Sequence, residues 1–231
     1  MTHSSKIVAV LLALTGAVAS AAPITPAYTS FGTLAGATFG GSGIPNTAVA
    51  IYTSGGDLTL GLTAHQRYVG PNLANDGAGT FSAPAGVSAD PPSSPADPYA
   101  LWNFAFYIGG ADVSDLTFSI FYDFDPAVGN DESTHGSVSY PGVAIGIVPG
   151  LDQNSWNLGM DFLTTGGPGI VAPAGAFDPN AAGEYTFALV AYNVGGGEVG
   201  RSAIRVNVPE PGSLALVGLA LFGLAAVRRR S

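Results

Sequence analysis

The chain of 231 residues contains no cysteine and little charge. The absence of cysteine excludes a disulfide framework, a thiolate metal site and a cysteine nucleophile. Charged residues make up only 10% of the sequence, and 16 acidic residues outnumber 7 basic ones. Because nucleic-acid-binding domains carry clustered basic residues, this balance argues against a nucleic-acid partner. The hydrophobic share of 47% is, in contrast, high enough to form a core.

The first 21 residues show the features of a secretory signal peptide in their usual order. Lys6 supplies positive charge, residues 7–18 form an uncharged apolar run, and Ala19-Ser20-Ala21 is a small-x-small cleavage site. A short buried helix is the alternative interpretation, but it does not account for this order. We therefore expect signal peptidase to cut after Ala21, so that the mature chain begins at Ala22.

The other end of the chain, residues 208–231, forms a second targeting segment. Pro209-Glu210-Pro211 precedes an uncharged apolar run over residues 214–227, and Arg228, Arg229 and Arg230 follow that run. As a helix, the run would span about 21 Å, which is shorter than the ~30 Å hydrocarbon core of a bilayer. The arginines would stay on the cytoplasmic side. The pattern predicts a membrane helix in the precursor, and an ordinary tail anchor is the less specific alternative.

The order of motif, short apolar helix and basic terminus resembles the PEP-CTERM sorting signal of exported proteins from Gram-negative bacteria. The resemblance rests on Pro209, Glu210 and Pro211, the run that follows them, and the arginines at 228–230. It implies transient insertion in the inner membrane, and cleavage near the motif by an exosortase that releases or transfers the protein. It further implies a final location at the cell surface or outside the cell, in the context of exopolysaccharide and biofilm.

Residues 22–207, between these two signals, are predicted to form one all-β domain. Glycine-rich turns separate short segments in which apolar residues alternate with small or polar ones. Such a pattern is typical of an antiparallel sandwich, and we expect a Greek-key-like one. Thr47–Thr53 and Val143–Val148 are two further expected strands. The apolar stripes comprise Leu58, Leu60, Leu62 and Ala64; Trp102, Phe104, Phe106 and Ile108; Phe118, Ile120, Tyr122 and Phe124; Trp156, Leu158, Met160 and Phe162; Tyr185, Phe187, Leu189 and Ala191; and Ile204, Val206 and Val208.

The start of one expected strand resembles the tyrosine corner of immunoglobulin-like domains. Gly183-Glu184-Tyr185 follows the corner-forming sequence Asp178-Pro179-Asn180. In a tyrosine corner the phenol hydrogen-bonds back to the backbone of the corner. An ordinary core tyrosine is the alternative.

Side chains suited to catalysis are scarce in residues 22–207. No Gly-x-Ser-x-Gly elbow occurs, and the only histidines are His65 and His135, which we expect to be solvated. Glutamates are few, and most aspartates fall in expected turns, where they cap the backbone. The sequence therefore predicts a protein that is not an enzyme.

One acidic segment is a candidate metal site. Asp123 and Asp125 share one face of an expected strand, and the following loop can bring Asn130, Asp131 or Glu132 back towards them. We take Asp131 as the third candidate ligand. Oxygen ligands in such a cluster suit calcium, although the spacing is not that of an EF-hand. The alternative is a solvated acidic hairpin with no bound metal.

These observations predict an exported component of the cell surface or matrix with a structural or interaction role. Its expected partners are signal peptidase, an exosortase and an extracellular polysaccharide. Two alternatives stay open: a secreted hydrolase whose aspartates are assembled only by the fold, and a calcium-dependent glycan-binding module.

Overall fold

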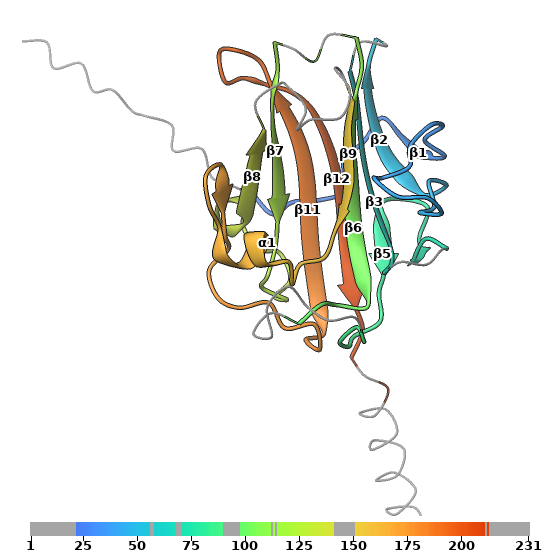
Figure 1. Ribbon diagram of the computed structural model, residues 1–231, viewed down its shortest axis with the longest axis vertical. Coiled ribbons are helices and arrows are strands. Elements are labelled where there is room, and N and C mark those ends of the chain that lie inside the picture. Colours follow the sequence, from blue (N-terminus) through green and yellow to red (C-terminus); the bar gives the residue numbers. More distant parts are fainter. Residues whose placement is uncertain are drawn as a thin grey trace, which may run out of the picture.

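The computed structural model describes residues 22–210 and Gly212, except 56–57, 68–70, 90–97, 112, 114 and 141–150. Two β-sheets make up most of this part of the chain, and Figure 1 shows β8, β7, β11 and β12 on one side and β6, β3, β2 and β1 on the other. The all-β prediction is confirmed. None of the described helices is long and apolar enough to cross a membrane. The expected signal peptide and sorting helix lie outside the described residues.

The first sheet has five antiparallel strands in the order β1-β2-β3-β6-β9. Alternation explains its buried face, because Leu60, Leu62 and Phe104 are 0% exposed and point into the core. The strands are β1 (Ser30–Gly32), β2 (Val49–Ser54), β3 (Leu58–Gln66), β6 (Trp102–Gly109) and β9 (Leu151–Trp156).

The second sheet has seven strands in the order β10-β8-β7-β11-β12-β5-β4. It corrects the expectation of purely antiparallel pairing, because β5 and β12 run parallel. These two strands are far apart in the sequence, so no hairpin fixes their relative direction. The strands are β4 (Ala74–Asn75), β5 (Thr80–Ser82), β7 (Thr117–Tyr122), β8 (Gly136–Tyr140), β10 (Ile170–Val171), β11 (Gly183–Tyr192) and β12 (Glu198–Val208).

The two sheets face each other across a shared aromatic core. The ring of Phe104 in β6 stacks on Phe187 in β11 with 4.7 Å between centroids, and Trp102 meets Phe187 edge-on at 6.1 Å. Both members of the stacked pair are fully buried. All six expected apolar stripes therefore contribute to this core, and five of them lie on strands, although Phe124 lies just beyond the end of β7.

The prediction that the stripe from Trp156 to Phe162 forms a strand was wrong. Strand β9 ends at Trp156, and the fully buried Asn157 then holds a turn, because its side-chain oxygen accepts hydrogen bonds from the backbone N–H groups of Ala100 and Gly159. A short helix, α1 (Asp161–Thr165), follows, and its Phe162 ring lies 5.2 Å from that of Trp156. The expected strand at 143–148 lies outside the described residues.

The predicted tyrosine corner is confirmed at the start of β11. The Tyr185 hydroxyl donates to the carbonyl oxygens of Ala181 and Asp178 at 3.3 and 3.5 Å. Burial, together with the nearby carboxylate of Asp178, raises the pKa of Tyr185 to about 12. The phenol therefore stays protonated and can keep donating to the corner at physiological pH.

Candidate functional site

The candidate sorting motif begins where the folded sheet ends. Strand β12 carries Ile204, Val206 and Val208 into the core, and Val208 pairs with Gly183 of β11 as the last residue of the strand. Pro209 and Glu210 come directly after it and are exposed. Two of the three motif residues are thus accessible without any opening of the sheet. The other predicted processing residues, Ala21, Pro211 and Arg228–Arg230, lie outside the described residues.

At the N-terminal end of the domain, residues 22–27 are fixed against the outer face of the seven-stranded sheet. Ile24 is 3% exposed among Ala188, Val190 and Ala203. Ala27 and Ala203 exchange two backbone hydrogen bonds, of 3.1 and 2.8 Å. The ordered domain therefore includes the segment that begins at Ala22, the residue expected to follow the signal-peptide cleavage site.

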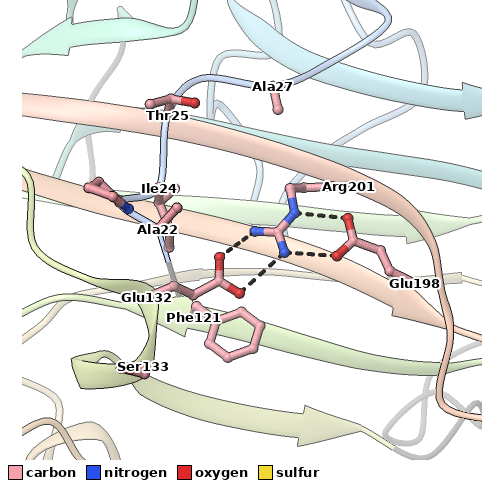
Figure 2. Close-up of a pocket in the computed structure, with 10 residues that line it drawn as sticks. Ala22, Ile24, Thr25, Ala27, Phe121, Glu132, Ser133, Glu198 and Arg201 are labelled. Carbon is pink, nitrogen blue, oxygen red and sulfur yellow. Dashed lines mark hydrogen bonds and ion pairs between the residues drawn. The ribbon is translucent and has the colours of Figure 1, made fainter. Parts of the chain in front are cut away.

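The same face holds a pocket of about 690 Å³ with a charged cluster in its wall. Figure 2 shows Arg201 between Glu132 and Glu198, with Phe121 beside Glu132. The Arg201 guanidinium donates to Glu132 at 2.6 and 3.2 Å and to Glu198 at 2.9 Å through both Nε and Nη2. Sequence reasoning did not find this cluster, because Glu132 and Arg201 are far apart along the chain.

The electrostatics of this cluster limit what it can bind. The hydrogen bonds that Arg201 donates to Glu198, and then those to Glu132, raise the pKa of Arg201 above its already high value, so the guanidinium stays charged. Two carboxylates surround one cation, which leaves a local excess of negative charge. The cluster therefore disfavours anionic ligands, and it ties η1 (Glu132–Thr134) to strand β12.

The family comparison decides the nature of the C-terminal segment. The model of the PEP-CTERM protein-sorting motif matches residues 207–230. The chain carries a PEP-CTERM sorting motif at these residues. The match includes the exposed Pro209 and Glu210, and the predicted resemblance is confirmed. A comparison with curated proteins finds no match to the chain.

A PEP-CTERM sorting domain marks its protein for export and for processing by an exosortase. The protein is therefore located at the cell surface or outside the cell after processing. The matched segment covers the end of β12 and the residues beyond it, and it does not extend into the rest of the β-domain. The role of the domain must accordingly be argued from its own residues.

The predicted calcium ligands are not gathered into one group. Asp123 is buried, and its carboxylate accepts hydrogen bonds from the backbone N–H of Asp125 at 2.9 Å and from Asn130 Nδ2 at 3.1 Å. Asp131 accepts from the Ser133 backbone at 2.9 Å and caps η1. Burial raises the pKa of Asp123, whereas the Ser133 hydrogen bonds lower that of Asp131. In the part of the chain that the structure describes, no three acidic, histidine or cysteine side chains are placed to hold a metal ion.

Both histidines of the domain are buried, so the expectation of two solvated side chains was wrong. His65 and His135 are 1% and 7% exposed. His65 Nε2 lies 2.8 Å from Ser155 Oγ, and His135 Nε2 lies 2.6 Å from Thr186 Oγ1. Alternation placed His65 on the outer face of its strand correctly. No local pattern, however, showed that a distant serine would contact it.

Proposed function

We propose that residues 22–207 form a structural or interaction module that exosortase processing delivers to an exopolysaccharide matrix or biofilm. The observation that carries this proposal is the position of the sorting motif, with Pro209 and Glu210 exposed directly after Val208, the last core residue. Cleavage at the motif leaves β12 and the core complete. The exported product is therefore a domain that keeps all of its described strands.

The charge of the domain favours a neutral polysaccharide as its partner. Residues 22–208 contain 15 acidic residues against Arg67, Arg201 and Arg205, a formal charge of −12. Self-repulsion of this kind keeps a protein soluble and opposes binding to anionic polymers. The carboxylates around Arg201 add to that repulsion on the face drawn in Figure 2.

Replacing Pro209, Glu210 and Pro211 together by alanine should leave most of the protein as a full-length, membrane-bound precursor. The processing enzyme would no longer recognise the motif, while the apolar run at 214–227 would still hold the chain in the membrane. Immunoblots of membrane and medium fractions from the native host measure this shift.

The matched control is Val194→Ala, which removes methyl groups from a side chain that is 88% exposed in the β11–β12 hairpin. This variant should be processed and released like the wild type. Normal release of the triple alanine variant would overturn the proposal, because the motif would then be incidental to sorting.

A further inference from the structure

A polar network lies on the outer face of the five-stranded sheet, where β3, β6 and β9 run side by side. His65 in β3 stands opposite Asn103 in β6, and Ser155 comes from β9. Ser155 Oγ lies 2.8 Å from His65 Nε2 and accepts a hydrogen bond from Asn103 Nδ2 at 3.0 Å. The buried Asn157 donates to Asn103 Oδ1 at 2.8 Å and so fixes the orientation of that amide. Three strands thus hold one serine hydroxyl between an imidazole and an amide donor.

The hydrogen bonds determine which imidazole nitrogen carries the proton. His65 Nδ1 lies 2.7 Å from the carbonyl oxygen of Gln66, which can only accept, so Nδ1 carries the hydrogen. In the neutral ring Nε2 then has a free lone pair and accepts from the Ser155 hydroxyl. A nucleophile bonded to a base that a third group orients is the arrangement used in nucleophilic catalysis.

A pocket of about 220 Å³ lies over this serine. Ile44 and Met160 give it apolar walls, and the backbone of Gly40 and Gly41 forms part of its rim. Arg67, whose guanidinium carbon lies 4.1 Å from the centroid of the Tyr99 ring, lines the same pocket and carries a positive charge. The pocket is smaller than the roughly 300–1,000 Å³ that is usual for drug-sized ligands, so it suits a short acyl group.

We propose that Ser155 is a nucleophile activated by His65, and that this pocket takes the acyl group of a short-chain ester. The inference goes beyond the proposed matrix role and does not depend on it. It also departs from the prediction that the protein is not an enzyme. The sequence offered no elbow motif for this serine, because Ser155 lies within a strand and meets His65 only through the pairing of β3, β6 and β9.

In the acylation step, Ser155 Oγ bonds to the ester carbonyl carbon and its proton passes to His65 Nε2. The bond from that carbon to the alcohol oxygen then breaks, and the leaving alcohol takes the proton from His65. Water attacks the acyl-serine in the same way, which releases the carboxylic acid and restores the serine. The positive charge of Arg67 in the pocket favours the negative charge that develops on the carbonyl oxygen.

The reaction should follow the protonation of His65. Of the described residues that line the pocket, His65 and Arg67 are the titratable ones, and the described facing segments at 39–44, 103, 154–155 and 160 contribute no others. Burial lowers the pKa of His65 below 6.5, and the active form is the neutral ring. The rate should therefore rise with pH through a midpoint below 6.5 and level off above it.

The test is to treat the purified exported protein with p-nitrophenyl acetate and, separately, with a short-chain alkyl fluorophosphonate. We expect ester hydrolysis and one fluorophosphonate adduct, located at Ser155 by peptide mass. Ser155→Ala should abolish both. His65→Gln should slow both by at least about a hundredfold, since glutamine keeps a hydrogen-bonding side chain but is not a base. Ser30→Ala, at an exposed serine of β1 outside the pocket, should react like the wild type.

Thermal unfolding is measured for each variant to establish that it is folded. If Ser155→Ala fails to fold, the rates of His65→Gln decide the test. The proposal is overturned if the wild type forms no adduct, if the adduct lies on another residue, or if folded His65→Gln reacts at the wild-type rate. Any of these results would mean that the network only satisfies its own hydrogen bonds.

Discussion

The Phe187→Ala variant is expected to melt roughly 6–20 °C below the wild type. Phe187 is 0% exposed, stacks on Phe104 across the sandwich and meets Trp102 edge-on. Truncation of a buried phenylalanine removes about 3–5 kcal/mol from the free energy of unfolding, because apolar contacts are lost and a cavity is left. Each kcal/mol lowers the melting temperature of a domain of this size by about 2–4 °C.

Val194→Ala is the control for this effect, because it also shortens an apolar side chain but does so in an exposed hairpin turn. Its free energy of unfolding should stay within about 0.5 kcal/mol of the wild type. If Phe187→Ala melts as high as Val194→Ala, the two sheets do not share the core described above. Thermal unfolding followed by circular dichroism measures both variants.

Gly183→Ala is expected to lower the free energy of unfolding by about 2–6 kcal/mol. Gly183 has a φ of +152°, and a methyl group placed there would lie 2.1 Å from the carbonyl oxygen of Pro126. That oxygen already accepts a hydrogen bond from the Glu184 backbone N–H at 3.0 Å, so it cannot easily move away. Since Gly183 pairs with Val208, the change should also loosen the end of β12 next to the sorting motif.

The matched control is Gly196→Ala, in the turn between β11 and β12. Gly196 also has a positive φ, +77°, but nothing lies within 4 Å of an added methyl group. Gly196→Ala should therefore lower the free energy of unfolding only by the cost of the left-handed backbone conformation, about 1–2 kcal/mol. Equal melting temperatures for the two alanine variants would show that the close approach of Pro126 to Gly183 is not a constraint on the fold.

The all-β class and most of the core-lining strands could be predicted from the sequence, because an alternation of period two indicates which side chains face the core. Leu58–Ala64 and Tyr185–Ala191 are examples in which each expected apolar position is buried. The failure at Trp156–Phe162 has a physical cause. Apolar residues in a turn and a short helix can fill the same core, and the hydrogen bonds of the Asn157 side chain hold the turn that follows the strand.

The candidate sites also differ in whether the sequence could predict them. Pro209-Glu210-Pro211 could be recognised because a processing enzyme reads a contiguous stretch of chain, which is a local property of the sequence. The clusters around Arg201 and Ser155 could not be recognised, since each one joins residues from separate strands. The acidic segment at 123–131 could not be decided from the sequence, because turn-capping aspartates and calcium ligands have the same composition.

The central claim is that a folded domain is exported and separated from its C-terminal signal, and the intact mass of the protein recovered from the medium tests it most directly. We predict a chain that begins at Ala22 and ends near Pro209-Glu210-Pro211, without the run at 214–227 and without Arg228–Arg230, with or without an added group at the new terminus. Recovery of released protein whose mass still includes the arginines at 228–230 would contradict the account.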